Sequence, residues 1–408
     1  MTAVKQKKFE KSAEKFRQCV ANEQYKGAIK HARDALKIVP NHMVVQSDLA
    51  FALLRDKQYQ ASYYQYQKIF HASDAQKAQA SATWLDGLTE VCGWLGREAE
   101  LQRYGCLSLR TADQNIASVA QATPVTRPHF NPREPARNVI AYSLFGDLPR
   151  YCETAVLNAQ VAKQLYPHWC CRFYVAEDVP QHVVLRLQQH GAQIVQMVRA
   201  ESEVNPLMWR FLALDDPEVD FYLLRDADSL LCQKEAAAVN QWLASGYWYH
   251  HMRDYFSHTE LLLAGMWGGC RGQLPTIEPL MVDYCREQLK AGRFIDQLFL
   301  KSTLWPTVRQ SILNHDEIFK FHNAHPYPPF EAQQMETDQF HIGSNFSFQA
   351  VGGPSSCESE QHWRLLDEQS AEVCRYTSAV NGGRWSQTLP WYYIQAIEEG
   401  VWRIELSE

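Results

Sequence analysis

Residues 219–231, Val-Asp-Phe-Tyr-Leu-Leu-Arg-Asp-Ala-Asp-Ser-Leu-Leu, decide the fold of this chain of 408 residues. The apolar run 221–224 predicts a buried strand, because strands covered on both faces are short and continuously apolar. Asp226 and Asp228 follow at once, and alternation along extended chain points both carboxylates the same way. Ligands of open α/β sheets bind beyond such strand ends. The pair therefore predicts a site for a divalent cation and a phosphate; an acidic turn is the plainer interpretation.

The composition favours two packed domains, because 408 residues are many for one hydrophobic core. Twelve Trp and nineteen Tyr argue against a disordered chain. The net charge of -6 gives no reason to expect nucleic acid as a partner. The eleven cysteines show no Cys-x-x-Cys spacing, which predicts reduced thiols and a cytoplasmic location. No signal peptide or transmembrane segment is expected, because no apolar run has the required length.

Residues 1–122 predict an all-α domain. Apolar residues recur at helical spacing from Tyr25 to Leu36, and Pro40 closes the run. A similar run starts at Tyr59, 34 residues after Tyr25, and a degenerate third one runs from residue 78 to residue 101. The period resembles the tetratricopeptide repeat. Such repeats stack and commonly leave a concave groove for a partner; the alternative is a set of helical hairpins that only cap the other domain.

The pattern changes after a proline-rich linker at residues 123–136, which places the boundary near residue 125. Residues 137–408 form the second predicted domain. Strand patterns alternate there with helix patterns, which predicts an α/β domain with parallel strands. The predicted strands are 138–144, 171–176, 193–198 and the strand before Asp226, and the predicted helices are 151–165, 180–190 and 207–214.

Six motifs follow one another in this second domain. They are Tyr142-Ser143-Leu144-Phe145-Gly146, Arg210 in Met-Trp-Arg-Phe, Asp226-Ala227-Asp228, the Gly-rich stretch from Gly265 to Gly269, Asp296-Gln297, and Phe340-His341-Ile342-Gly343. In these motifs residues 137–350 resemble nucleotide-sugar glycosyltransferases of the GT-A fold, with a layout similar to glycogenin and the bacterial lipopolysaccharide glycosyltransferases. The resemblance implies a Rossmann-like mixed sheet flanked by helices, behind the all-α N-terminal repeat domain.

The resemblance also implies a metal and a donor. Asp226 would contact the donor ribose or the metal, Asp228 would chelate Mn²⁺ or Mg²⁺, and His341 would be the third ligand, with His315 as its rival. A UDP-hexose is favoured as the nucleotide-sugar, although no residue identifies the base. The other residues expected along the donor are Tyr142, Ser143, Phe145, Arg210, Arg225, Gly268 and Gly269. Arg225 has the alternative of pairing with Asp226 or Asp228.

Catalysis of transfer is expected from Asp296 and Gln297, which in the related families face the transferred sugar and the acceptor. The plainer interpretation of Asp296 is a charge at a helix N-terminus. Residues 250–260 are expected to form a loop in which Asp254 and Glu260 line the acceptor pocket and are candidate bases. Asp296-Gln297 resembles the pair of retaining relatives, which favours retention of anomeric configuration. Trp209, Trp248, Tyr255 and Trp267 are either core residues or stacking surfaces for sugar and base.

Two other function classes compete with a transferase. Asp-x-Asp after an apolar strand also opens the haloacid-dehalogenase phosphatases, but there the motif lies on the first strand, and Leu230 replaces the usual Thr or Val. The second alternative is an adaptor with an inactive transferase-like domain, against which the intact carboxylate pair argues. For a transferase the acceptor is a saccharide, a protein or a peptide, which the repeat domain would recruit.

Overall fold

The computed structural model describes residues 2–119, 125–288, 292–331 and 340–407. They form two compact units. The first unit contains the chain up to Asn115 together with Asp254–Leu261 and Asp316–Asn323, and the second contains the remaining residues. Two short segments from within the α/β part of the sequence therefore belong to the helical unit, which no sequence pattern had indicated.

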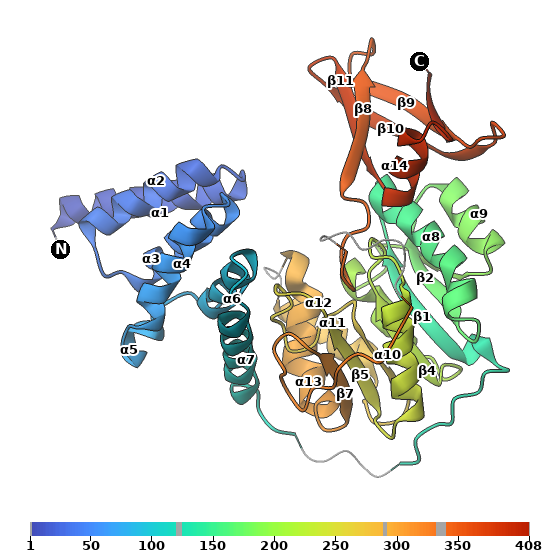
Figure 1. The fold of residues 1–408 in the computed structure, drawn as a ribbon, viewed down its shortest axis with the longest axis horizontal. Helices are drawn as coiled ribbons and strands as arrows, with labels where there is room; N and C mark the ends of the chain where they lie inside the picture. The colour runs from blue at the N-terminus through green and yellow to red at the C-terminus, as the bar shows by residue number, and fades with distance from the viewer. Residues whose placement is uncertain (1, 120–124, 289–291, 332–339, 408) are drawn as a thin grey trace. The chain divides into compact units, whose positions relative to one another are not determined.

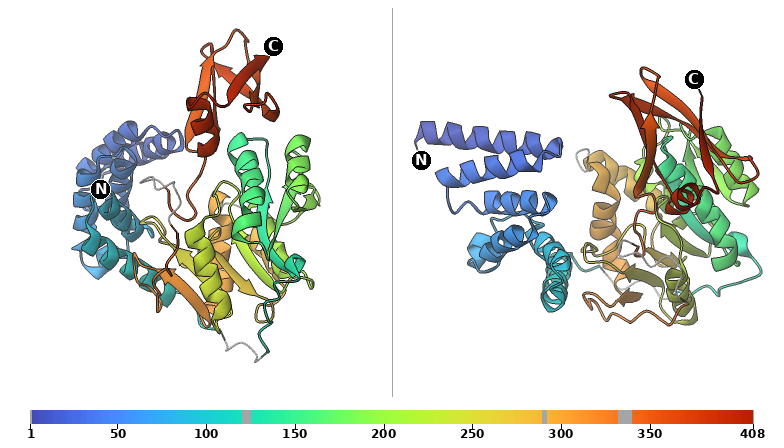
Figure 2. Two further views of the ribbon diagram at one scale, coloured as in Figure 1. Left: turned by 45° about the vertical axis from the view of Figure 1, so that its right-hand side comes forward. Right: turned by 45° about the horizontal axis from the view of Figure 1, so that its top comes forward.

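The helices of the first unit follow one another as neighbours (Figure 1 and Figure 2). They are α1 (Ala3–Ala21), α2 (Tyr25–Ile38), α3 (Met43–Arg55), α4 (Tyr59–Phe70), α5 (Asp74–Lys77), α6 (Trp84–Trp94) and α7 (Glu98–Gln114). Tyr25 and Tyr59, the residues that define the 34-residue period in the sequence, each begin a helix. Small buried residues such as Ala28 and Ala32 let α2 approach its neighbours closely.

One turn geometry recurs between these helices. Glu23, Lys57 and Gly96 have positive φ values of 56°, 59° and 64°. The residue after each donates its backbone N–H five positions back, to the carbonyls of Cys19, Leu53 and Cys92. This is the Schellman arrangement, which satisfies carbonyls at a helix end. Its recurrence between α1 and α2, α3 and α4, and α6 and α7 supports an internal repeat, while the tetratricopeptide assignment remains a prediction.

The two inserted segments are held by phenylalanines. Phe256 packs over Gly93 of α6 and Phe319 over Gly105 of α7, so closely that a Cβ on either glycine would overlap the ring. Phe256 also meets Trp94 edge-on, with ring centroids 5.1 Å apart. The absence of a side chain at these two glycines therefore lets the phenylalanine rings of segments that are distant in sequence pack directly on the helices.

Asp48 of α3 makes the stability of the first unit depend on pH. Burial raises the pKa of its carboxyl to about 6, from 3.8, and Arg17 opposes that shift. Because the folded-state pKa is raised, the contribution of Asp48 to stability is lost as pH rises from about 4 to above 6. We expect Asp48→Asn to raise the unfolding free energy at pH 7.5 by about 1 kcal/mol, after discounting for partial exposure, and to have little effect at pH 4. Thermal melts at the two pH values test this; an equal effect at both would contradict it.

The second unit is built on a mixed sheet of seven strands in the order β3-β2-β1-β4-β6-β5-β7. The bounds are β1 (Asn138–Leu144), β2 (Cys170–Ala176), β3 (Gln193–Met197), β4 (Phe221–Arg225), β5 (Tyr249–Arg253), β6 (Trp267–Cys270) and β7 (Ile312–Asp316). β1 pairs in parallel with β2 and with β4, whereas β4 pairs antiparallel with β6. β4 is buried at every position, as its continuous apolar run predicts.

Helices connect and cover these strands (Figure 1). They are α8 (Pro149–Leu165), α9 (Gln181–Gln189), the 3₁₀ helix η2 (Pro206–Leu214), α10 (Gln233–Ala244), α11 (Ile277–Glu287), the 3₁₀ turn η3 (Gly292–Phe294), α12 (Ile295–Phe299), the π-helical turn η4 (Leu300–Leu304) and α13 (Trp305–Val308). The prediction of a mixed α/β sheet flanked by helices is confirmed. The expected loop over 250–260 is wrong in its first part, because His250 and His251 lie inside β5 and are buried there. No helix in the described ranges is long and apolar enough to cross a membrane.

An antiparallel sheet that the sequence analysis did not anticipate follows residue 348. Its strands are β8 (Gln349–Pro354), β9 (Glu360–Leu366), β10 (Glu372–Asn381), β11 (Arg384–Leu389) and β12 (Arg403–Ser407), with α14 (Trp391–Glu398) before the last strand. The order is β12-β9-β10-β11-β8. Trp363 and Trp385 stack within its core, with centroids 5.7 Å apart. Residues 137–408 therefore contain more than the single α/β sheet expected there.

A buried carboxylate joins this sheet to α8. Glu153 is fully buried and pairs with Arg186 of α9 at 2.8 Å. Its two oxygens also accept hydrogen bonds from the hydroxyls of Tyr376 at 2.6 Å and Tyr393 at 3.1 Å. α8, α9, β10 and α14 thus share one hydrogen-bonded carboxylate, which stabilises only if all its partners are present.

We expect Glu153→Ala to lower the unfolding free energy by about 3 kcal/mol, because it leaves the half-buried Arg186 guanidinium without its charged partner and two buried tyrosine hydroxyls without their acceptor. Glu153→Gln keeps the shape and part of the hydrogen bonding, so its loss should be smaller. Glu368→Ala, in an exposed turn, is the control. Chemical denaturation followed by tryptophan fluorescence measures the three variants; the prediction fails if Glu153→Ala and Glu368→Ala unfold at the same denaturant concentration.

Candidate active site

The candidate site lies where the order of strands reverses. The chain builds β1, β2 and β3 outward to one side and then returns to place β4 on the other side of β1. β1 ends at Leu144 and β4 at Arg225, in parallel register. A crevice beyond the carboxyl ends of two such strands is the usual ligand site of an open α/β sheet. Asp226 and Asp228 come directly after β4 and stand at this position.

Arg210 joins two of the predicted acidic residues. It lies on η2, and its backbone N–H donates to Ser143 Oγ of β1 at 3.0 Å. Its Nη1 lies 2.8 Å from Asp226 Oδ1, and its Nη2 lies 2.9 Å from Asp296 Oδ2. The Arg210 side chain is only 4% exposed. One planar guanidinium therefore holds the Asp-Ala-Asp motif and the Asp296-Gln297 motif in fixed relative positions, which a flexible ammonium would do less well.

Asp228 is paired with a residue that the sequence analysis missed. Arg150 Nη2 lies 2.7 Å from Asp228 Oδ2. Burial raises the pKa of the Asp228 carboxyl, the charge of Asp226 raises it further, and Arg150 opposes both. Arg150 is in the first turn of α8, directly after β1 and its turn. The sequence offered one indication of Arg150: it is a basic residue at the start of the helix that follows the first strand of the sheet, where phosphate groups commonly bind.

Asn158 of α8 fixes the loop after the Asp-Ala-Asp motif. Its Nδ2 donates to the Ser229 carbonyl at 2.8 Å, and its Oδ1 accepts from the Leu231 N–H at 2.9 Å. On the other side, the Phe346 N–H donates to the Asp228 carbonyl at 2.8 Å, and Ser229 forms a bridge with Asn345. The segment that follows His341-Ile342-Gly343 is therefore hydrogen-bonded to the loop that carries Asp228.

Gly265 is required by the closeness of Asp226. A Cβ at this glycine would overlap the Asp226 carboxylate, so a larger residue would displace it. The neighbouring Ala264 N–H donates to Gln297 Oε1 at 3.2 Å. Burial raises the pKa of the Asp296 carboxyl, and Arg210 opposes the rise. The Gly-rich stretch, Asp226 and the Asp296-Gln297 pair are thus in mutual contact.

The donor atoms fit a divalent cation only in part. Asp226 and Asp228 supply carboxylate oxygens of the type that Mg²⁺ and Mn²⁺ prefer, and such ions keep positions for substrate phosphates. In the described part of the chain, however, no group of three or more His, Cys, Asp or Glu side chains is arranged to hold a metal ion. His341 Nδ1 lies 2.9 Å from the carbonyl of Ile342. The two aspartates would therefore be the protein ligands that a bound ion uses, with His341 still a prediction.

Several other predicted residues are placed within the core. Tyr142 is fully buried and stacks on Phe173 with a centroid separation of 4.6 Å. Arg225 is buried and pairs at 2.6 Å with Glu235, and not with Asp226 or Asp228 as the sequence left open. Glu235 was not expected at all, because pairing across β4 and α10 cannot be seen from spacing. A donor role for Tyr142 and Arg225 remains a prediction.

The glycines of β6 have a packing role. A Cβ at Gly268 would overlap the Tyr222 backbone of β4, and one at Gly269 would overlap the side chains of Tyr222 and Tyr249. Phe145, in contrast, is half-buried beyond the end of β1 and meets Trp209 edge-on at 6.3 Å. Phe145 comes directly after the end of β1 at Leu144, and its donor role remains a prediction.

No protein-family model and no curated protein matches the chain. Three solved structures illustrate the likenesses found. An O-GlcNAc transferase mutant of Thermobaculum terrenum is 14% identical over 55% of this chain and 47% of that one, with a TM-score of 0.27. A glucosyl-3-phosphoglycerate synthase of Mycobacterium tuberculosis with Mn²⁺ and UDP-glucose is 15% identical over 38% of this chain and 65% of that one, with a TM-score of 0.25. A mannosyltransferase of Pyrobaculum calidifontis with GDP-Man and Mn²⁺ is 12% identical over 46% of this chain and 60% of that one, with a TM-score of 0.27.

The chain thus spans 47% to 65% of the length of these three structures.

The remaining candidates are divided between the two units. Asp254 and Glu260 belong to the first unit, whereas Asp226, Asp228 and Asp296 belong to the second. His315 is fully buried in β7, its Nε2 lies 2.8 Å from Gln241 Oε1, and burial lowers its pKa to about 4. The aromatic candidates divide in the same way. Trp209, Trp248 and Trp267 are buried in the second unit, and the Tyr255 ring contacts the Phe256 ring in the first, with the two planes tilted by 31°.

Proposed function

We propose that this chain is a metal-dependent glycosyltransferase of the GT-A fold that transfers a hexose from a nucleotide-sugar, with a UDP-sugar as the favoured donor. The observation that carries the proposal is the position of Asp226 and Asp228 at the switch point between β1 and β4. Arg210 supports it, because one guanidinium joins Asp226 to Asp296 at 2.8 Å and 2.9 Å. Such a group of paired charges at a strand end is typical of functional sites.

Each residue has a role in this proposal. A divalent ion bound by Asp226 and Asp228 would supply charge stabilisation for the departing diphosphate. Arg150 lies beside Asp228 and is placed to bind phosphate oxygens through its planar guanidinium. Arg210 orients Asp226 toward the donor and holds Asp296 in place. Asp296 and Gln297 face the transferred sugar, and we favour retention of its anomeric configuration.

The acceptor is a saccharide, a protein or a peptide, and we propose that the helical repeat domain recruits it. Removal of residues 1–120 is a poor test of this idea. Phe256 and Phe319 pack on Gly93 and Gly105, so the deletion would expose both rings in the remaining protein. Point variants in the helical unit avoid this difficulty.

Titration calorimetry of the full chain with UDP and with GDP, in Mn²⁺ and in EDTA, tests the proposed function. We expect UDP to bind at least tenfold more tightly in Mn²⁺ than in EDTA, because the ion bridges the carboxylates to the diphosphate. Equal affinity under both conditions would contradict metal dependence. Slow hydrolysis of UDP-hexose by the same sample would support a transferase, whereas hydrolysis of a simple phosphomonoester would favour the phosphatase alternative.

A further inference from the structure

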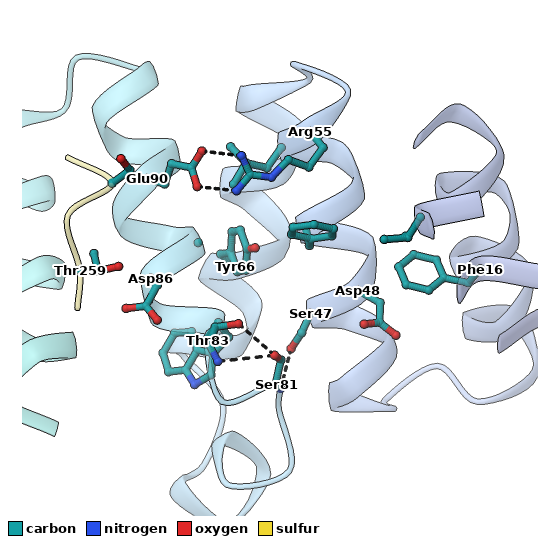
Figure 3. A pocket seen from close by; sticks show the side chains of 16 residues that line it. Phe16, Ser47, Asp48, Arg55, Tyr66, Ser81, Thr83, Asp86, Glu90 and Thr259 are labelled. Atoms are coloured by element: carbon teal, nitrogen blue, oxygen red, sulfur yellow. Dashed lines mark hydrogen bonds and ion pairs between the residues drawn. The ribbon is translucent and has the colours of Figure 1, made fainter. Parts of the chain in front are cut away.

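The first unit contains a cavity of about 340 Å³ that the proposed transfer does not use. Its lining comes from α1, α3, α4 and α6, with Ser257 and Thr259 of the inserted segment (Figure 3). All these residues belong to one compact unit. This volume is within the range of cavities that bind small ligands or single side chains. The charge and polarity of the lining residues then indicate which chemical class of ligand the cavity would bind.

The charge of the lining is acidic. It contains three carboxylates, Asp48, Asp86 and Glu90, against one guanidinium, Arg55. Arg55 binds Glu90 with both terminal nitrogens, at 3.0 Å and 2.8 Å, which compensates that carboxylate. Asp48 makes no ion pair with the described residues, and burial raises its pKa while the exposed Arg17 opposes the rise. A cation that entered the cavity would meet a negative potential that is not fully compensated.

A buried hydroxyl lies among these charges. Tyr66 of α4 is only 2% exposed, lines the cavity, and makes no hydrogen bond with another described residue. Figure 3 shows it in the middle of the cavity, between Asp86 and Asp48. A buried hydroxyl without a partner is unfavourable. Burial and the charge of Glu90 both raise the pKa of Tyr66, so it remains a neutral hydroxyl that can accept a hydrogen bond.

Aromatic and hydroxyl groups complete the lining. Phe51 and Trp84 offer ring faces, and the guanidinium of Arg55 already lies 5.3 Å from the centre of the Phe51 ring. Such faces attract cations. The hydroxyls of Ser81, Thr83 and Thr259 line the same cavity, and groups of this type bind the amides of a peptide backbone.

We propose that this cavity binds a lysine or arginine side chain of a basic partner peptide, with Asp48, Asp86 and the Tyr66 hydroxyl as its acceptors. The proposal does not depend on glycosyl transfer and holds for a transferase or for an adaptor. The acidic lining selects for the charge of the partner.

Fluorescence anisotropy with the full chain tests the proposal. The probe is a fluorescein-labelled peptide of alternating Gly and Lys, and the matched peptide has Glu in place of Lys. We expect saturable binding of the Lys peptide only, weakened at least tenfold by the double variant Asp48→Asn/Asp86→Asn and several-fold by Tyr66→Phe. Binding should also weaken with added NaCl, because ion pairs are screened. Asp48→Asn alone is measured too, in case the double variant fails to fold.

The double variant Asp34→Asn/Asp74→Asn is the control, since it changes the net charge equally on residues of the same unit that do not line the cavity. If the control lost as much affinity for the Lys peptide, the loss in Asp48→Asn/Asp86→Asn would come from the net charge of the protein and not from the cavity, and the proposal would be overturned. Wild-type affinity in Asp48→Asn/Asp86→Asn, or binding of the Glu peptide, would overturn it as well. So would a dimer that dissociates only in Asp48→Asn, because the occupant would then be a second copy of this chain.

Discussion

Asp228→Asn is expected to lower hydrolysis or transfer from UDP-hexose about a thousandfold, which equals roughly 4 kcal/mol of transition-state stabilisation. The substitution removes one of the two carboxylates at the switch point while keeping its size. It also leaves Arg150 without a charged partner at 2.7 Å. The metal-dependent part of UDP affinity should disappear with it. Initial rates and calorimetry in Mn²⁺ and in EDTA measure both effects.

Asp283→Asn is the control for this variant, because Asp283 lies on α11 of the same unit with a side chain 70% exposed. Its activity and its nucleotide affinity should equal those of the wild type. If Asp228→Asn retained metal-dependent affinity for UDP, the ion would be held elsewhere and the role of the motif would be wrong. If it lost thermal stability instead, its pairing with Arg150 would be structural.

The central strands and the position of the carboxylates follow from local physics. β1 has the predicted bounds, and β4 follows from four apolar residues in a row, because burial on both faces leaves a continuous apolar pattern. Asp226 and Asp228 then follow the strand end directly, but Ala227 and Asp228 lie in a turn, and not in the extended chain that the alternation argument assumed. These inferences need only neighbouring residues, which is why one sequence suffices for them.

The partners of those carboxylates could not be predicted in the same way. Arg150 precedes Asp228 by 78 residues, and Arg210 reaches Asp296 across 86. Such contacts arise when parallel strands bring several connections to one sheet edge, and no periodicity encodes them. Arg225 shows the same limit. Its neighbours in sequence offered two aspartates, yet its guanidinium turns back to Glu235, which shares its buried position.

The C-terminal sheet was missed although a signal existed. In β10 the buried residues alternate with exposed ones, as in a strand with one solvated face. This pattern is polar on one side and therefore lacks the apolar run that marks β4. The assignment of Asp254–Leu261 and Asp316–Asn323 to the helical unit had no comparable signal, because it depends on two glycines opposite two phenylalanines.

Asp296→Asn is expected to lower transfer by at least a hundredfold while leaving the melting temperature nearly unchanged. Asn keeps the acceptor for the Gln297 N–H, which Asp296 Oδ1 binds at 2.9 Å, and Arg210 keeps its ion pair with Asp226. The loss would therefore report the negative charge of Asp296, which we propose faces the sugar. Transfer rates, UDP affinity and thermal melts separate the possibilities; UDP affinity should stay close to that of the wild type.

The competing explanation is that Asp296 only stabilises the first turn of α12. Loss of such a carboxylate costs about 0.5–2 kcal/mol of stability and leaves turnover intact. Glu278→Gln, in the first turn of α11, is the matched control for that effect. A catalytic Asp296 lowers turnover in one variant only, whereas a helix effect gives two variants with lower melting temperatures and normal turnover. NMR of the first-formed linkage then tests retention, and a product inverted relative to the donor would assign a base role to a carboxylate such as Asp296, Asp254 or Glu260 instead.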